Sequence, residues 1–351
     1  MANKVILIGA INEGNVPTCG ETMKNQLFIK RFKELFDKVI TVDTLNWKKR
    51  PWILVRLFFV LLLNRGAKVI ISASGAASYL ISILYYIPLK KDVYFWVVGG
   101  DLHLSIQKGN YNLKALSSLQ RILVQGQCMV KELEKLGLMN ALHVPNSKPI
   151  TFTPNIEADN DDKIRFVFLS RVHPHKGIRE IYEAAKILNN KGYSNGYTID
   201  LYGKIEPSFT DEFNGYISKI ENMNYLGFLN LTNNDGYKTL SSYDVMLFPT
   251  YWGGEGFPGI VIDANMSGLP IIASDWNMNK EVILDGKTGF LIPTHDAQAL
   301  ATQMEKFIIK EVDLYAMKHN CVDYIQKYDF RSVLSEELMY QIHLKTRISS
   351  I

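Results

Sequence analysis

The sequence predicts an α/β protein built from two Rossmann-like domains that face each other across a cleft. Short runs rich in Val and Ile alternate with longer segments of helical periodicity, which is typical of parallel sheets covered by helices on both faces. The pattern stops once, at residues 149–162, which are polar and contain two prolines, as expected of a linker. A chain of 351 residues is also long enough to form two hydrophobic cores.

The predicted strands fall into two groups. In the first domain, residues 1–152, we expect strands at 5–8, 39–42, 69–72, 93–98 and 122–124. In the second domain, residues 163–325, we expect strands at 164–169, 197–202, 225–226, 245–249, 271–273 and 289–292. Residues 326–351 are predicted to form a helix that crosses back to the first domain. Because ligands bind beyond the carboxyl ends of parallel strands, the cleft between the domains is the expected site.

Composition excludes several classes of protein. Hydrophobic residues make up 47% of the chain and charged residues 21%, which is ordinary for a folded globular protein. The three cysteines form no CxxC pair, which argues against a disulfide framework or a zinc ribbon. No signal peptide is evident at the N-terminus. We therefore expect a cytoplasmic protein.

Charge is unevenly distributed along the chain. The first 155 residues hold 20 Lys and Arg against 9 Asp and Glu, a net charge of +11, whereas the remainder holds 19 basic and 26 acidic residues, a net charge of −7. A basic half of this kind suggests contact with an anionic surface. The basic half lacks the aromatic and basic interleaving of nucleic-acid-binding modules, so nucleic acid is not an expected partner.

The most apolar segment, residues 52–63, allows two interpretations. It is interrupted by Arg56 and is too short for the roughly 20 residues that span a bilayer. A basic cluster at 48–50 and Trp52 precede it, so it could lie in a membrane interface. The favoured interpretation is a buried crossover helix, because the segment is apolar on most faces.

A cationic loop follows the first strand of the second domain. Arg171 and Lys176 stand just before a helix that begins after Gly177. Free N–H groups and the helix dipole make such a helix start suitable for a diphosphate, and the two cations would strengthen the site. The alternative is a solvated loop with incidental cations. His173 and His175 have no third ligand nearby, so no metal site is expected.

A glycine-rich loop follows the predicted strand at 245–249. Its three glycines let the backbone approach a ligand, and the helix that starts at Pro258 and Gly259 offers free N–H groups to hydroxyl or phosphate oxygens. Glu255 precedes this helix and Asp263 lies on its second turn. Two carboxylates could then accept hydrogen bonds from a sugar and a ribose of one ligand. Alternatively, Asp263 is an ordinary solvated helix residue.

Several segments, in order, resemble one family. They lie at 255–264, 268–274 and 281–292, and upstream at 124–146 and 170–177. Together they resemble the family-four retaining glycosyltransferases of the GT-B fold, over about residues 120–295. The resemblance implies a nucleotide-sugar donor bound by the second domain and an acceptor bound by the first.

The resemblance also implies roles for individual residues. Arg171 and Lys176 would neutralise the diphosphate, and Glu255 would hold hydroxyls of the donor sugar. Asp263 would hold the ribose, although the family carries Glu there, so the contact would be longer or bridged by water. Further donor contacts are expected at Gly20, Gly203, Phe228, Phe257, Pro258 and Gly259. Alternatively, Gly203 and Phe228 belong to ordinary strand ends and turns and make no contact with the donor.

Two residues of the first domain are candidates to act beside the reacting sugar. Asp101 and His103 follow the predicted strand at 93–98, where the family places an acidic residue or histidine. They would orient the acceptor or stabilise positive charge on the sugar. A histidine that merely satisfies a local hydrogen bond is the alternative for His103.

The implied reaction is transfer of a sugar with retention of anomeric configuration. We expect neither metal nor cofactor, because cations replace the metal and no Asp-x-Asp clamp is visible. The expected enzyme is a hexosyltransferase that uses a nucleoside-diphosphate sugar, UDP being the expected nucleotide. Its acceptor would be a glycan or lipid-linked molecule in capsular or other surface polysaccharide synthesis, with peripheral contact to an anionic membrane.

Two alternatives to this activity stay open. One is a nucleotide-sugar epimerase of the same fold, which needs no acceptor. The other is a nucleotide- or glycan-binding protein with impaired catalysis, suggested by Asp263 in place of Glu.

Overall fold

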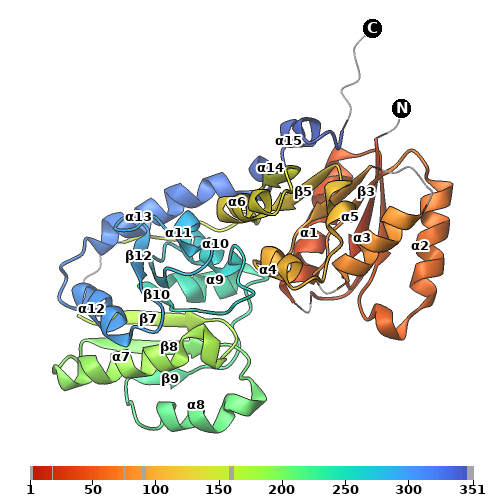
Figure 1. Cartoon of the computed structure of the whole chain (residues 1–351). Helices are drawn as coiled ribbons and strands as arrows, with labels where there is room; N and C mark the ends of the chain where they lie inside the picture. The colour runs from red at the N-terminus through yellow and green to blue at the C-terminus, as the bar shows by residue number, and fades with distance from the viewer. Residues whose placement is uncertain (1–2, 18, 75, 88–91, 158–161, 346–351) are drawn as a thin grey trace. The chain divides into compact units, whose positions relative to one another are not determined.

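The computed structural model describes residues 3–17, 19–74, 76–87, 92–157 and 162–345 (Figure 1). The chain divides into two compact units. The first unit contains the residues up to Lys148 together with the segment from Phe330 onward, and the second runs from Pro149 to Asp329. Residues 149–157 of the predicted linker contain no helix or strand. Residues 158–161 of that linker lie outside the described ranges.

The first unit contains a six-stranded parallel sheet with the strand order β2-β1-β3-β4-β5-β6. Its strands are β1 (Lys4–Gly9), β2 (Lys38–Asp43), β3 (Lys68–Ile71), β4 (Val93–Trp96), β5 (Arg121–Val124) and β6 (Ala141–His143). Its helices are α1 (Gly20–Leu35), α2 (Trp52–Leu63), α3 (Ala77–Tyr86), α4 (Leu102–Gln107), α5 (Leu113–Ser117), α6 (Gln127–Lys135), α14 (Phe330–Val333) and α15 (Glu336–Gln341), with the 3-10 turn η1 (Trp47–Lys49).

The end of the chain contributes to the core of the first unit. Phe28 of α1 packs on Trp96 of β4, with ring centroids 4.5 Å apart. Met339 and Ile342 from the region of α15 belong to the same buried cluster. The backbone N–H of Phe330 donates to the carbonyl oxygen of residue 148, at 3.0 Å. Residues that are remote in sequence therefore complete this core.

The second unit contains a six-stranded parallel sheet with the strand order β12-β11-β10-β7-β8-β9. Its strands are β7 (Ile164–Leu169), β8 (Tyr197–Tyr202), β9 (Met223–Tyr225), β10 (Val245–Phe248), β11 (Ile271–Ser274) and β12 (Gly289–Ile292). Its helices are α7 (Ile178–Asn190), α8 (Thr210–Ile217), α9 (Asn234–Ser241), α10 (Gly259–Met266), α11 (Asn279–Val282), α12 (Ala297–Ile308) and α13 (Leu314–Ile325). Three 3-10 turns, η2 (Pro174–Lys176), η3 (Pro207–Phe209) and η4 (Gln326–Tyr328), complete it.

The predicted strands are all present, with ends that differ by at most two residues. Most of their Val and Ile side chains are buried because helices cover both faces of each sheet, whereas Val39 and Ile40 of the edge strand β2 are half-buried. β6 was not predicted, since its sequence Ala-Leu-His contains no β-branched residue. This strand lies at the sheet edge, where little apolar surface needs to be buried.

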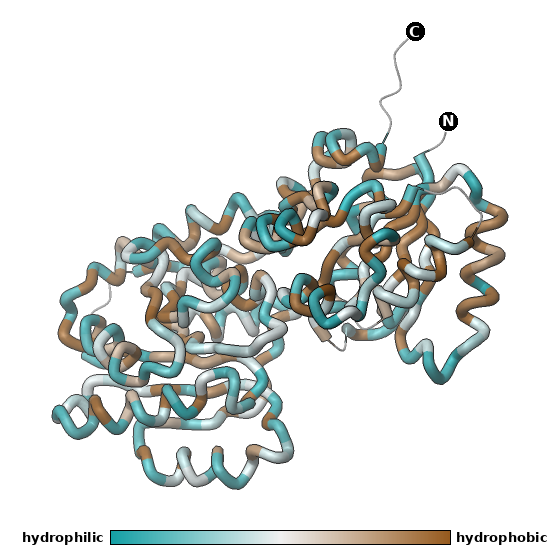
Figure 2. The backbone as a smooth tube through the Cα atoms, viewed as in Figure 1, coloured by the Kyte–Doolittle hydropathy of each residue, from teal (hydrophilic) through white to brown (hydrophobic). Residues whose placement is uncertain are grey.

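α2 connects the parallel strands β2 and β3 of one sheet, as predicted for a crossover helix, but the expectation that it is buried is wrong. Only Ile53, Leu57 and Leu61 of this helix are buried, whereas Phe59 and Leu63 are more than half exposed. Figure 2 shows the hydrophobic colour along much of α2. The helix packs on its unit through one narrow stripe, and most of its other apolar side chains are exposed.

Candidate functional site

The loops after β7 and β10 lie where the strand order of the second unit reverses. The chain places β8 and β9 on one side of β7, and then β10, β11 and β12 on the other. β7 and β10 are neighbouring parallel strands, so their following loops leave the same edge of the sheet. Open α/β sheets bind ligands at such a switch point.

Gly177 holds these two loops together. Its φ of +81° lies in the left-handed region, and a Cβ at this position would lie 2.3 Å from the carbonyl oxygen of Pro249. The Tyr251 N–H donates to the carbonyl oxygen of His175, and the Tyr251 hydroxyl donates to that of Pro174, both at 2.9 Å. Glycine is therefore required where the two loops approach each other.

Two cations lie around the indole of Trp252. Lys176 is only 6% exposed, and its Nζ lies 6.0 Å from the Trp252 ring centroid and 5.9 Å from that of Phe248. The guanidinium carbon of Arg171 lies 5.0 Å from the Trp252 ring centroid. A buried ammonium needs a compensating charge, which Lys176 finds in the carboxylate of Glu255.

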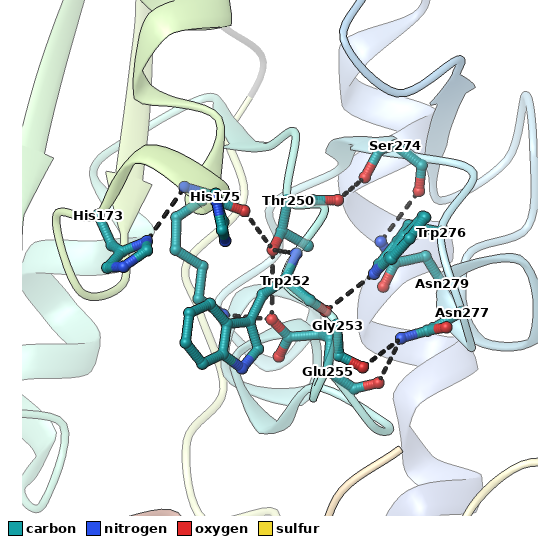
Figure 3. Close-up of polar contacts among 11 residues, drawn as sticks. His173, His175, Thr250, Trp252, Gly253, Glu255, Ser274, Trp276, Asn277 and Asn279 are labelled. Atoms are coloured by element: carbon teal, nitrogen blue, oxygen red, sulfur yellow. Dashed lines mark hydrogen bonds and ion pairs between the residues drawn. The ribbon is translucent and has the colours of Figure 1, made fainter. Parts of the chain in front are cut away.

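The loop that carries Glu255 is fixed by hydrogen bonds from its neighbours (Figure 3). Thr250 donates from Oγ1 to Glu255 Oε2 at 3.3 Å, and Asn277 donates from Nδ2 to the Glu255 carbonyl oxygen at 2.9 Å. Trp276 donates from Nε1 to the carbonyl oxygen of Trp252 at 2.9 Å. These contacts hold the Glu255 carboxylate and the backbone at Trp252 and Glu255 in place, as a preorganised site requires.

His173 also lies against Trp252, but it is not one of the cations of the site. Its Nδ1 accepts a hydrogen bond from the backbone N–H of His175 at 3.1 Å, and its ring meets that of Trp252 edge-on, with centroids 5.0 Å apart. Burial, and then the neighbouring His175, Arg171 and Lys176, lower the pKa of His173. The lowered pKa disfavours the charged form of His173, so Arg171 and Lys176 are the cations that the site places beside Trp252.

The start of α10 follows the Glu255 loop directly. Pro258 is the N-cap residue and makes no side-chain hydrogen bond to the first turn, which begins at Gly259. Phe257 is buried, and its ring packs edge-on against Tyr328, with centroids 4.9 Å apart. The Phe257 side chain therefore positions the helix start, so a donor contact at this residue is left to its backbone.

Asp263 is buried on α10, at 3% exposed. The hydroxyl of Tyr237, from α9, donates to Asp263 Oδ1 at 2.9 Å. Burial, and then the charge and hydrogen bond of Asp263, raise the pKa of Tyr237. The structure thus gives one carboxylate oxygen a tyrosine partner, and the role of Asp263 toward a ribose stays a prediction.

Gly203 and Phe228 follow the ends of β8 and β9. A Cβ at Gly203 would lie 1.7 Å from the carbonyl oxygen of Ser170, and the Gly203 N–H donates to the carbonyl oxygen of Gly227 at 2.7 Å. Packing against the end of β7 is thus enough to require glycine at position 203. The Phe228 side chain is 78% exposed, which leaves its ring open to stack with a ligand.

The candidates of the first domain lie at two helix starts. Gly20 is the first residue of α1, and a Cβ there would meet nothing within 4 Å. Asp101 is exposed at the N-cap of α4 without a side-chain cap hydrogen bond. His103 is half-buried, and its Nδ1 is buried without a hydrogen-bond partner in the part of the chain that the structure describes. Among the described residues of the first unit, no neighbouring atom requires glycine at position 20.

Several residues of the site were not predicted from the sequence. Thr250, Trp252, Trp276 and Asn277 were not among the predicted site residues, although they fix or flank Glu255 and Lys176. Thr250 and Trp252 stand beside the glycine-rich loop, so their closeness in sequence was an available signal. Trp276 and Asn277 follow β11, and only the strand order brings them near.

The arrangement can bind one anionic group and several hydroxyls. Two cations and an uncapped helix start suit a diphosphate, and a carboxylate in the same cluster can accept hydrogen bonds from hydroxyls. Among the described residues, no group of three or more His, Cys, Asp or Glu side chains is placed to hold a metal ion. The fold and site together define a two-domain α/β protein with a site suited to an anionic group and neighbouring hydroxyls.

The comparison with protein families identifies the class. Residues 150–328 match the family described as "Glycosyl transferases group 1". Since the match covers half of the chain, the chain belongs to this family, which confirms the resemblance predicted from the sequence.

Individual relatives agree with this assignment. The capsular polysaccharide biosynthesis glycosyltransferase CapM of Staphylococcus aureus is 26% identical over 187 residues, which cover 53% of this chain and 48% of CapM. The UDP-Gal:alpha-D-GlcNAc-diphosphoundecaprenol alpha-1,3-galactosyltransferase of Escherichia coli is 27% identical over 158 residues, which cover 44% of this chain and 39% of that enzyme. The matched segments therefore span half or less of the length of these relatives.

The structure also resembles a solved glycosyltransferase. The lipopolysaccharide outer core galactosyltransferase WaaB, in its apo form, superposes with a TM-score of 0.71 at 13% identity, covering 97% of this chain and 99% of that one. This likeness and the two parallel sheets confirm the predicted GT-B fold class.

Proposed function

We propose that the protein transfers a sugar from a UDP-sugar to a glycan or lipid-linked acceptor, with retention of configuration and without a metal, in surface polysaccharide synthesis. The observation that carries the proposal is the buried Lys176–Glu255 pair beside Arg171, at the switch point of the second sheet. The donor and acceptor classes are supported by the name of the Escherichia coli relative, which contains UDP-Gal and a diphosphoundecaprenol acceptor.

Charge development in the reaction matches the residues of the site. Breaking the bond between the anomeric carbon and the phosphate oxygen leaves negative charge on UDP and positive charge on the sugar. Lys176, Arg171 and the start of α10 stabilise the departing diphosphate. When Lys176 turns to the phosphate, Glu255 becomes available to accept hydrogen bonds from the sugar hydroxyls.

The remaining steps concern the acceptor. The acceptor oxygen bonds to the anomeric carbon on the face that UDP leaves, and the departing phosphate oxygen takes the acceptor proton. Asp101 and His103 are our candidates to orient the acceptor in the first unit. Gly20, Gly203, Phe228 and Asp263 are the candidates for further donor contacts.

The test is sugar release from UDP-glucose, UDP-galactose and UDP-N-acetylglucosamine in EDTA, with and without an undecaprenol-diphosphate sugar. Transfer that needs the acceptor and survives EDTA supports the proposal, and NMR of the product reports the anomeric configuration. Conversion of the UDP-sugar without acceptor would identify an epimerase instead. Binding without any turnover would identify a protein with impaired catalysis.

A further inference from the structure

The outward side of α2 is apolar where helices on a protein surface usually carry polar residues. Its buried stripe is narrow, and the apolar residues that it exposes are Trp52 at 58%, Leu54 at 38%, Val55 at 59%, Phe58 at 45%, Phe59 at 53% and Leu63 at 79%. Arg56 is the charged residue of this helix; it is exposed and donates to the carbonyl oxygen of Thr41. Contiguous exposed apolar side chains of this size mark an interaction site.

Aromatic residues of α3 extend this surface. Tyr79 is 60% exposed, and its ring centroid lies 5.5 Å from that of Trp47. Tyr79 of α3 and Leu54 of α2 line the same small apolar cavity, so the two helices lie side by side (Figure 1). Tyr86, at the end of α3, is 71% exposed. Trp and Tyr are the side chains that favour the interface between lipid and water.

We call this surface the α2–α3 face. It consists of Trp52, Val55, Phe58, Phe59, Leu63, Tyr79 and Tyr86.

Positive charge surrounds the α2–α3 face. Residues 44–91 contain eight Lys and Arg and no Asp or Glu. Lys48, Lys49 and Arg50 precede α2 and are exposed, and Arg65 is exposed just after it. Within the described ranges these four residues form no ion pair. Cations at both ends of an apolar helix complement a surface of anionic lipid headgroups.

We propose that the α2–α3 face docks on an anionic membrane, with α2 lying in the plane of the interface. Twelve helical residues rise about 18 Å, which is shorter than the roughly 30 Å of the hydrocarbon core. No helix within the described residues is long and apolar enough to cross a membrane. In the docked state the outward side chains enter the lipid, and the cations at 48–50 and Arg65 meet the headgroups.

A second copy of the chain fits this face less well than lipid does. A two-fold dimer would pair the same patch with itself, which would bring the basic clusters of two copies close to each other. Like charges brought together at an interface oppose association. Membrane docking does not depend on sugar transfer from the donor. That docking brings the site to a lipid-linked acceptor rests on the proposed function.

The test is cosedimentation of the full chain with phosphatidylcholine vesicles, with and without about 30% phosphatidylglycerol. We expect binding only to the anionic vesicles, weakened as salt rises from about 50 to about 500 mM. Two variants, Phe58→Ser/Phe59→Ser and Lys48→Glu/Lys49→Glu, should each weaken binding by about tenfold or more. The control Lys30→Glu/Lys33→Glu makes the same charge change at exposed positions of α1 and should bind as wild type.

Folding and oligomeric state are measured on the same samples. The replaced side chains are exposed, so the thermal midpoints should stay close to that of wild type. Absence of vesicle binding, equal binding to neutral and anionic vesicles, or unchanged binding by the variants would overturn the proposal. A dimer in light scattering that Phe58→Ser/Phe59→Ser abolishes would assign the face to a second copy. UDP binding should be equal in all these proteins, so failure of docking and failure of the donor site are distinguishable.

Discussion

Replacing Lys176 by Met should destabilise the second unit strongly. The side chains of Lys176 and Glu255 are only 7% and 14% exposed, so Lys176→Met leaves a carboxylate buried without its partner. Breaking a buried ion pair on one side costs about 3–5 kcal/mol. For a unit of this size, that corresponds to a fall in the thermal midpoint of roughly 10 °C.

A double variant isolates the interaction energy between Lys176 and Glu255 from the other effects of each substitution. Glu255→Gln alone leaves the ammonium unpaired, whereas Lys176→Met/Glu255→Gln removes both charges. We expect the double variant to lose less free energy of unfolding than the two single variants lose together, by about 2 kcal/mol or more. Lys186→Met is the matched control, because its pair with Glu183 is exposed at 43% and 49%. Loss of that pair should cost less than about 1 kcal/mol.

The assay is urea unfolding followed by circular dichroism, repeated with differential scanning fluorimetry. Two results would contradict this expectation: equal stability of Lys176→Met and Lys186→Met, or single effects that simply add in the double variant. Either result would mean that the contact between Lys176 and Glu255 carries no coupling energy.

Three further outcomes are expected. Gly177→Ala should lower the free energy of unfolding by about 2 kcal/mol or more, because the added Cβ meets a carbonyl oxygen at 2.3 Å. Gly192 has a similar positive φ but open space around it, so Gly192→Ala should lower the same quantity by only about 1 kcal/mol. Burial lowers the pKa of Lys24 from 10.5 to about 7, so the unfolded chain binds more protons between these values and stability rises with pH across that window. Lys24→Met should remove this slope from a plot of thermal midpoint against pH. Tyr237→Phe should cost about 1–3 kcal/mol in urea unfolding, because it leaves a buried oxygen of Asp263 without its tyrosine partner.

Each of these outcomes can fail in a recognisable way. Equal costs at positions 177 and 192 would show that the close approach of the two loops is not rigid. An unchanged pH slope in Lys24→Met would show that the ammonium is hydrated in the folded protein. A Tyr237→Phe variant as stable as wild type would show that water replaces the tyrosine at Asp263.

The sheets were predictable because burial on both faces imposes a local signature. β7 and β8 consist largely of apolar residues, and their ranges follow directly from the sequence. β6 was not predicted because an edge strand of three residues does not need a run of Val and Ile. The burial of α2 was predicted wrongly, since hydropathy reports which side chains are apolar and not which of them other elements cover.

The site was predictable in its parts but not in its contacts. Arg171, Lys176 and Glu255 stand at strand-to-helix turns, where parallel sheets place ligand-binding groups. The pairing of Lys176 with Glu255, 79 residues apart, depends on β7 and β10 being neighbours. Strand order follows from the packing of the whole unit, so no local pattern could reveal this contact. The same reason hid Asn277, whose hydrogen bond to Glu255 comes from the loop after a third strand.

The most direct measurement of the central claim is the thermal shift that UDP, GDP, ADP and TDP produce in EDTA, for wild type, Lys176→Met and Lys186→Met. A ligand at about 100 times its Kd adds roughly 2.7 kcal/mol, which should raise the midpoint by several degrees. We predict a shift with UDP in wild type and Lys186→Met, and its loss in Lys176→Met. A shift that requires a metal, that survives Lys176→Met, or that no nucleoside diphosphate produces would contradict the proposed donor site.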